Sequence, residues 1–191
     1  MKVEIIHNDL MIDGFIQIDR AKLRFELFDG AMSEIVTRWN VSRGDAVGVL
    51  LYDTVCRTVL LVRQFRYPVY TVEPENAWLW EIVAGSVDPG STPLQTAIKE
   101  VAEEAGYEVD EHDLQYICNY FVSPGGSSQR MYLYAVDLAN RPKNLQGGGV
   151  RYEAEDIQVI ELSYEQAYVG LAEGKIRDGK SIMALTWLRG S

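Results

Sequence analysis

Hydrophobic and polar residues alternate near the N-terminus, as they do in half-buried β-strands. Residues 22–27 alternate strictly, the Asp29-Gly30 pair that follows is a favoured hairpin turn, and a second strand is expected over about 33–41. Two strands bury too little apolar surface to be stable alone. The pattern therefore predicts that residues 1–44 form an antiparallel β segment that packs on the rest of the chain or on a second copy.

From residue 45 onward, short apolar runs alternate with segments of helical spacing. The expected strands are 47–52, 58–65, 78–83, 116–122, 131–136 and 157–162, and the expected helices are 93–105, 164–173 and 181–189. No linker divides this region, so residues 45–191 are expected to form one domain. The mixed order of strands and helices predicts an α/β fold around a mixed sheet.

Composition and charge narrow the possible partners. The chain has 191 residues, of which 47% are hydrophobic, and its net charge of −10 disfavours a nucleic-acid polymer as a partner. Its longest apolar run, residues 47–52, is far too short to cross a membrane. Cys56 and Cys118 form no metal-binding or disulfide motif, which favours a reducing, cytoplasmic setting.

The segment 92–106 carries complete signals for the start and the end of a helix. Thr92 can cap the first turn, Pro93 suits the first helical position, and Gln95 completes a capping box. Gly106 is placed to end the helix in a left-handed turn.

Three carboxylates project from one side of this expected helix. At about 100° per residue, Glu100, Glu103 and Glu104 fall within an arc of roughly 100°. Their mutual repulsion, and their place near the helix C-terminus, destabilise the helix. A divalent cation would reverse this effect, because Mg²⁺ prefers hard oxygen ligands. The three glutamates alone fit either a metal site or a solvated acidic face.

The stretch from Gly85 to Tyr107 closely resembles the Nudix box, G-x5-E-x7-R-E-U-x-E-E-x-G-U, in which U is a bulky apolar residue. The spacing matches throughout, but Ser91 and Lys99 replace the Glu and Arg that brace the loop in the family. The resemblance implies an α/β/α sandwich around a mixed sheet. It also implies hydrolysis of a diphosphate joined to another group, with Mg²⁺ or Mn²⁺ as cofactor.

The resemblance extends to the nucleoside-diphosphate-sugar pyrophosphatases, which include enzymes for ADP-ribose and for GDP-mannose. It is carried by residues 62–66, 80–85, 123–126, 147–149, 153–157 and 176–181. The Gly-rich loop and the Arg-Asp-Gly-Lys segment look closer to the GDP-mannose type. We therefore expect a small nucleotide sugar as the substrate.

The resemblance implies a metal site on the box helix and on the residue before the box glycine. By position, the expected ligands are the Ala84 carbonyl, Glu100, Glu104 and Glu103, with Glu153 as a further ligand.

The general base is expected in the late acidic loop. Glu153 is the best match, Glu155 is the alternative, and Glu103 is the next candidate. Gln129 stands where related proteins often have a Glu, and an amide cannot accept the proton of an attacking water. The glycines at 147–149 give this loop conformational freedom, which would let it swing over a ligand.

Substrate contacts are expected from Arg38, Arg66, Lys180, Gly125 and Gly126. Arginine suits bidentate contact with phosphate, and lysine supplies a point charge. Because related proteins form dimers that exchange the N-terminal region, we expect a homodimer in which Arg38 enters the neighbouring subunit's site.

Two functions remain open from the sequence. The first is a Mg²⁺-dependent hydrolase that cleaves a nucleoside diphosphate sugar into a nucleoside monophosphate and a sugar phosphate. The second is a catalytically impaired Nudix module that senses a nucleotide sugar. Ser91, Lys99 and Gln129 favour the sensor, whereas the intact glutamates of the box favour the enzyme.

Overall fold

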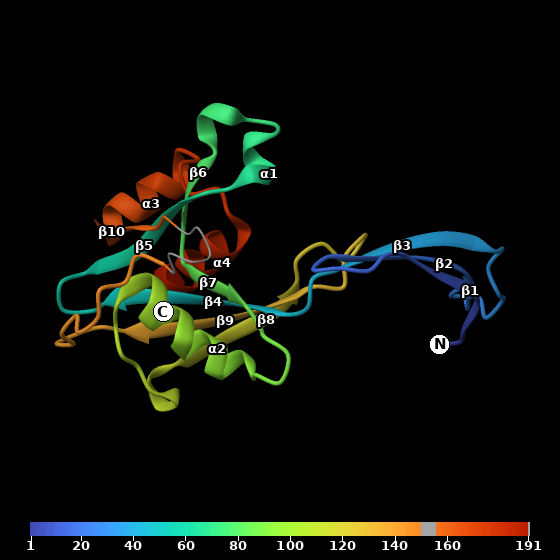
Figure 1. Ribbon diagram of the computed structural model, residues 1–191, viewed down its shortest axis with the longest axis horizontal. Coiled ribbons are helices and arrows are strands. Elements are labelled where there is room, and N and C mark those ends of the chain that lie inside the picture. The colour runs from blue at the N-terminus through green and yellow to red at the C-terminus, as the bar shows by residue number, and fades with distance from the viewer. Residues whose placement is uncertain (150–155, 191) are drawn as a thin grey trace. The chain divides into compact units, whose positions relative to one another are not determined.

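The computed structural model describes residues 1–149 and 156–190 (Figure 1). Its contacts divide the chain into two units. The N-terminal unit comprises Met1–Asp45 and Tyr120–Arg130, and the sandwich unit comprises Ala46–Asn119 and the chain from Met131 onward. The segment 120–130 thus belongs with the N-terminal strands, which the sequence pattern did not indicate.

The N-terminal unit is built on a three-stranded antiparallel sheet. Its strands are β1 (Val3–Ile12), β2 (Gln17–Phe25) and β3 (Val36–Ser42), with β2 in the centre. Leu23 of β2 pairs with Ile5 on one side and Val36 on the other. The Asp29-Gly30 turn lies in a longer loop between β2 and β3, where Gly30 has a φ of +85°. The expected antiparallel extension is confirmed, with an additional strand, β1.

The sandwich unit is built around a seven-stranded mixed sheet. Its strands are β4 (Ala46–Asp53), β5 (Thr58–Phe65), β6 (Trp78–Glu81), β7 (Val83–Ser86), β8 (Gln115–Phe121), β9 (Arg130–Asp137) and β10 (Gln158–Ser163). The main order is β10-β5-β4-β9-β8, with β4 parallel to β9 and antiparallel to β5. The predicted mixed sheet is therefore confirmed.

The sheet opens between β4 and β5. These two strands pair only near Leu51 and Leu60, after which β6 pairs with β5 and β7 pairs with β4. The single strand expected over 78–83 is therefore wrong, because the pairing partner changes at Ile82. The Ile82 N–H donates to Ser181 Oγ at 2.8 Å instead of to a strand. This break places Glu81 beside β5 and Ala84 beside β4.

Helices cover both faces of this sheet (Figure 1). The helices are α1 (Tyr67–Tyr70), α2 (Pro93–Glu100), α3 (Tyr164–Ala172) and α4 (Gly179–Gly190), with short turns η1 (Pro74–Asn76), η2 (Val101–Ala105) and η3 (Glu111–Asp113). One hydrophobic core joins α2 and η2 to the sheet through Ala97, Val101, Val49 and Val62. Figure 1 shows α3 on the opposite side of the sheet from α2, as expected for an α/β/α sandwich. Among the described residues, no helix combines the length and the apolar character needed to span a membrane.

Candidate metal and diphosphate site

The N-terminus of α2 forms as its sequence predicts. The Gln95 N–H donates to Thr92 Oγ1 at 3.2 Å, and the Thr92 N–H donates to Gln95 Oε1 at 2.9 Å. This capping box satisfies two backbone donors that the helix itself leaves without partners. It fixes where the helix begins, and hence where its glutamates lie relative to the sheet.

The C-terminal part of the expected helix differs from a regular α-helix. Residues Val101–Ala105 form a π turn, in which the Gly106 N–H donates to the carbonyls of Val101 (3.1 Å) and Ala102 (3.2 Å). Gly106 then ends the helix at a φ of +80°, as predicted. A π turn is wider than an α turn, so it changes the directions of Glu103 and Glu104 from those of a regular helix.

The side chains of Glu100 and Glu104 both reach the backbone at the start of the box, at Ala84 and Gly85. The Ala84 N–H donates to Glu104 Oε2 at 3.1 Å. The Glu100 carboxylate occupies the space beside Gly85 that a Cβ would otherwise fill, so a larger residue here would displace the Glu100 side chain. The structure thus brings together three of the predicted metal ligands at the start of the box.

These oxygen donors fit a divalent cation. The Glu104 side chain is only 2% exposed, and a buried carboxylate is costly unless positive charge or hydrogen bonds compensate it. Burial works to lower the pKa of the Arg66 guanidinium, but the hydrogen bond and the charge of Glu81, with a smaller contribution from the Glu104 charge, raise it. Carboxylate and carbonyl oxygens are the ligands that Mg²⁺ and Mn²⁺ prefer. We therefore regard Ala84, Glu100 and Glu104 as the candidate metal centre.

Glu103 is oriented differently from these two residues. Its side chain is 32% exposed and lies 3.6 Å from Lys99 Nζ, which is also 3.7 Å from Asp88. Burial alone would lower the pKa of Lys99, but the charges of Glu103, Glu100 and Asp88 raise it. Lys99 thus links the helix to the box loop through Asp88, although Ser91 cannot supply the family's glutamate.

A buried charge network lies at the break between β6 and β7. Glu81 is 2% exposed and accepts two hydrogen bonds from Arg66, from Nε at 2.7 Å and from Nη2 at 2.8 Å. Lys180 Nζ contacts Glu81 as well and lies 3.0 Å from Asp178. Burial works to raise the pKa of Glu81, but hydrogen bonds from Arg66 and the charge of Lys180 lower it to about 2. Arg66 and Lys180, which we predicted as phosphate contacts, are therefore held side by side by one carboxylate.

The sequence reasoning missed Glu81 and also Gln64. Gln64 is 8% exposed, and its Nε2 has no hydrogen-bond partner among the described residues. Gln64 lies near the end of β5, and Arg66 directly follows the last residue of this strand, Phe65. Glu81 and Gln64 are polar residues within apolar runs expected to be core strands. A polar residue at a buried strand position is unusual, and this signal could have identified both residues from the sequence.

The remaining predicted substrate residues meet in the N-terminal unit. Arg38, Gly125 and Gly126 line a hollow of about 410 Å³, together with Trp39 and Phe121. The hollow is held together by backbone pairing between β3 and the loop 123–128, where the Val41 N–H donates to the Gly126 carbonyl at 2.9 Å. The structure thus places these three residues in one site.

The predicted general bases, Glu153 and Glu155, lie outside the described residues. The glycines that precede them are described, and Gly147, Gly148 and Gly149 all have positive φ angles. The Gly148 N–H donates to the Glu104 carbonyl at 2.8 Å. The positive φ angles here serve a close backbone contact with the box helix, a use of these glycines that the sequence did not suggest.

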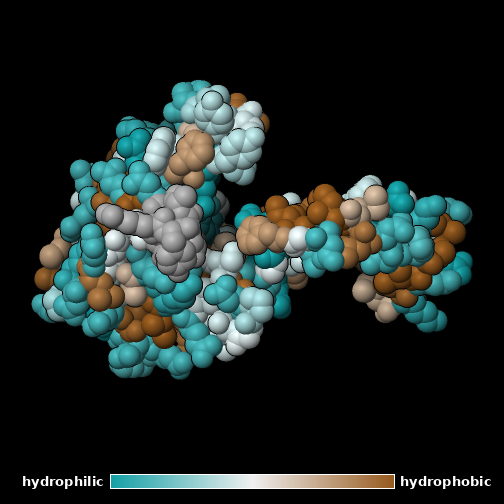
Figure 2. All heavy atoms as spheres, viewed as in Figure 1, coloured by the Kyte–Doolittle hydropathy of each residue, from teal (hydrophilic) through white to brown (hydrophobic). Residues whose placement is uncertain are grey.

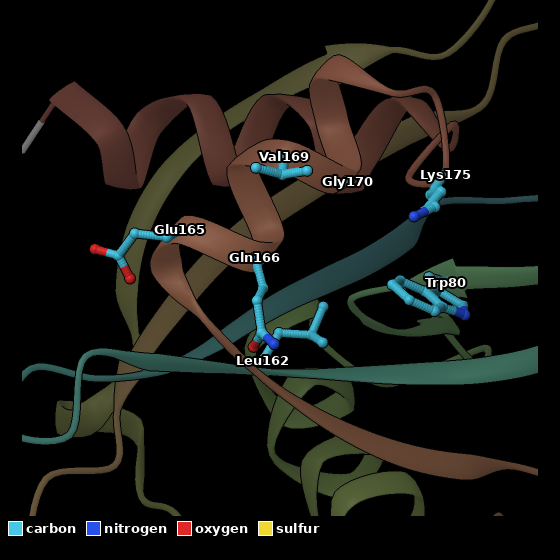
Figure 3. Close-up of a pocket in the computed structure, with 7 residues that line it drawn as sticks. All are labelled: Trp80, Leu162, Glu165, Gln166, Val169, Gly170 and Lys175. Atoms are coloured by element: carbon cyan, nitrogen blue, oxygen red, sulfur yellow. The ribbon is translucent and has the colours of Figure 1, made fainter.

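Two other features of the sandwich unit lie apart from the residues predicted to bind metal or substrate. A hollow of about 320 Å³ opens between α3 and the sheet, where Trp80 and Leu162 face the helix (Figure 3). It contains none of the residues predicted to bind metal or substrate. Asp110, His112 and Asp113 lie close together, but Asp110 caps the η3 turn, and Asp113 accepts the Asp110 N–H and pairs with Arg141. Its hydrogen bond from the Asp110 backbone and its pairing with Arg141 lower the pKa of Asp113, so this group has a structural explanation.

Comparisons with known proteins show which family the chain resembles. The NUDIX domain matches residues 42–185. The ADP-ribose pyrophosphatase of Haemophilus influenzae is 36% identical over 191 residues, covering 98% of this chain and 86% of that protein. The ADP-ribose pyrophosphatase of Escherichia coli K12 is also 36% identical, covering 98% of this chain and 88% of that protein.

A second type of relative has a different substrate in its name. The GDP-mannose pyrophosphatase of Pectobacterium atrosepticum is 33% identical over 183 residues, covering 96% of this chain and 92% of that protein. Among solved structures, the crystal structure of an ADP compounds hydrolase matches with a TM-score of 0.74 at 18% identity, covering 100% of this chain and 94% of the other, and supports the fold. With its α/β/α architecture, its box geometry and these matches, the chain belongs to the Nudix hydrolase family.

Proposed function

We propose that this protein hydrolyses the diphosphate of a nucleoside diphosphate sugar, of the ADP-ribose or GDP-mannose type, with Mg²⁺ as cofactor and Mn²⁺ as a substitute. The observation that carries the proposal is the convergence of Glu100 and buried Glu104 on the Ala84–Gly85 backbone. The names of the relatives support the substrate class, because both types act on a nucleotide sugar.

In this proposal, Ala84, Glu100 and Glu104 hold the metal, and Glu103 and Glu153 are further ligands. Bound Mg²⁺ would neutralise charge on the phosphate oxygens and lower the pKa of a bound water. The water oxygen attacks one phosphorus, and the bond from that phosphorus to the bridging oxygen breaks. The products are a nucleoside monophosphate and a sugar phosphate.

The residue proposed to accept the proton of the attacking water is Glu153, with Glu155 and then Glu103 as alternatives. The support is the position of Glu153 in the sequence, together with the substitution of Gln129 for a carboxylate. General-base catalysis is typically worth about 10²–10⁴-fold in rate.

Arg66 and Lys180 are proposed to contact the substrate while both side chains remain paired with the Glu81 carboxylate. A bidentate carboxylate fixes the Arg66 side chain, and Arg66 retains donors beyond the two that bond to Glu81. Such preorganisation reduces the entropy lost when phosphate binds. Gln64, whose Nε2 lacks a partner among the described residues, offers another donor two residues before Arg66 in the sequence.

We further propose a homodimer formed through the N-terminal unit, with Arg38, Gly125 and Gly126 binding substrate. Figure 2 shows hydrophobic residues gathered on this unit. The large exposed hydrophobic side chains in its strands and loops include Val3, Ile5, Ile6, Leu10, Met11, Ile12, Phe15, Phe28 and Ile35. An exposed apolar surface of this kind is typical of a protein interface. A cytoplasmic setting accords with the free thiols of Cys56 and Cys118.

The proposal is tested by incubating the full chain with ADP-ribose or GDP-mannose and Mg²⁺ and measuring the monophosphate released. Hydrolysis that requires the metal supports the proposal. A sensor would bind the nucleotide sugar and release no monophosphate. That result would contradict the proposed hydrolase and favour a nucleotide-sugar sensor.

A further inference from the structure

Three consecutive glycines pack by their backbone against the C-terminal end of the box helix. We name Gly147, Gly148 and Gly149 the glycine clamp. The Gly148 N–H donates to the Glu104 carbonyl at 2.8 Å, and the Gly149 N–H donates to the Glu103 carbonyl at 3.1 Å. The clamp therefore contacts the main chain of two glutamates in the box.

The π turn explains why these carbonyls are available. The last carbonyls of a helix have no partner within the helix, and water or another segment must satisfy them. Here the Gly106 N–H bonds to Val101 and Ala102, and the chain then turns away. The clamp supplies N–H donors to the two carbonyls that follow. It thus completes the hydrogen bonding of a turn whose side chains include Glu104.

The contact leaves no room for a side chain at the first clamp position. A Cβ on Gly147 would lie 2.8 Å from the Ala105 carbonyl carbon and 2.9 Å from the Glu104 carbonyl oxygen. Both are backbone atoms, which cannot rotate aside as a side chain can. Gly106 faces the same contact, because its own Cβ would lie 3.0 Å from the Gly147 nitrogen. Because neither Gly147 nor Gly106 has a side chain, the backbone of the loop can lie in close contact with the backbone at the end of the helix.

We propose that Gly147 is a positioning residue for the metal centre. Its close contact holds the π turn of residues Val101–Ala105 and thereby aims the Glu104 carboxylate at Ala84. This inference rests on the proposed function, because it assigns to Glu104 the role of a metal ligand. Gly147 itself touches neither metal nor substrate.

The substitution Gly147→Ala tests the proposal against the matched control Gly174→Ala. Gly147 has a φ of +64° and Gly174 a φ of +71°, so alanine meets a similar backbone strain at both positions. Only Gly147 is crowded, because a Cβ on Gly174 would have no neighbour within 4 Å. The pair therefore separates the effect of the close contact from the effect of the left-handed backbone.

The main readout is Mn²⁺ affinity, measured by calorimetric titration of each folded protein. Loss of a group that orients a metal ligand typically weakens metal binding by about 10–100-fold, and we expect a loss in this range for Gly147→Ala. Raised metal concentration should restore part of its hydrolytic activity. Gly174→Ala should bind Mn²⁺ as the wild type does. A folded Gly147→Ala protein with wild-type Mn²⁺ affinity would overturn the proposal.

A measurement on the wild type keeps the proposal testable if Gly147→Ala does not fold. Coupling between two sites is reciprocal, so a clamp that favours metal binding must be stabilised by the metal. Mg²⁺ should therefore slow amide exchange at Gly148 and Gly149 more than at Gly174, whose N–H donates to the Leu171 carbonyl in the last turn of α3. Unchanged exchange at Gly148 on adding Mg²⁺ would contradict the clamp. A wild type that hydrolyses no nucleotide sugar would instead refute the proposed function.

Discussion

Replacing Glu81 with glutamine removes the carboxylate that joins Arg66 to Lys180. Glu81 is buried, and its pKa falls from 4.5 to about 2 in the folded protein. That difference corresponds to about 3 kcal/mol of stability at neutral pH. The substitution also removes the carboxylate that pairs with Arg66 and leaves Lys180 with its contact to Asp178, and breaking a buried pair typically costs about 3–5 kcal/mol. We therefore expect Glu81→Gln to lower the free energy of unfolding by about 3 kcal/mol at pH 7.

The stability lost in Glu81→Gln should depend on pH in a definite direction. Because the folded pKa of Glu81 is lowered, its contribution is fully present above pH 4.5 and is lost as the pH falls toward 2. The difference in unfolding free energy between wild type and Glu81→Gln should therefore be largest at pH 7 and narrow at pH 3. Urea unfolding followed by circular dichroism at both pH values measures it.

Glu73 provides the matched control for this measurement. Its pKa is also lowered to about 2, by hydrogen bonds from Arg177 and Asn76, but the pair is exposed to solvent. Exposed ion pairs contribute little to stability, so Glu73→Gln should change the unfolding free energy far less than Glu81→Gln. Equal effects of the two substitutions, or a Glu81→Gln difference that does not narrow in acid, would refute the reasoning.

Three further predictions concern the site and the assembly. Glu104→Gln should lower hydrolysis by orders of magnitude while the metal-free protein keeps or slightly gains stability in urea, because repulsion with Glu100 is relieved; a collapse in stability would make Glu104 structural. Glu153→Gln should lower kcat by about 10²–10⁴-fold with KM nearly unchanged, and Glu155→Gln should cost much less; reversed effects in steady-state kinetics would assign the base to Glu155. Sedimentation should give a dimer of the 21.6 kDa chain that Ile5→Lys shifts toward monomer, whereas a fully active wild-type monomer would contradict the proposed interface.

Local signals in the sequence were sufficient for the start of the box helix. Thr92 and Gln95 are three residues apart, so the capping box needs no distant partner, and the structure forms it as predicted. The fold class also followed from the sequence, because the resemblance to the Nudix box covers a contiguous segment. These features depend on neighbours along the chain.

Features that depend on distant contacts could not be predicted in the same way. The expected helix becomes a π turn where Gly147 meets Gly106, 41 residues earlier in the sequence. The strand break at Ile82 depends on a hydrogen bond to Ser181, 99 residues away. Arg66 could be proposed as a phosphate contact from its residue type, but its pairing with Glu81 depends on how the chain after β5 folds beside β6.

The central claim is that the Glu100–Glu104 centre hydrolyses a nucleotide sugar. The most direct test incubates wild type and Glu104→Gln with ADP-ribose or GDP-mannose and Mg²⁺, and quantifies the nucleoside monophosphate by chromatography. The account predicts AMP or GMP release by the wild type that disappears on chelation of the metal and falls by orders of magnitude in Glu104→Gln. Tight binding of the nucleotide sugar by the wild type with no monophosphate released would contradict it.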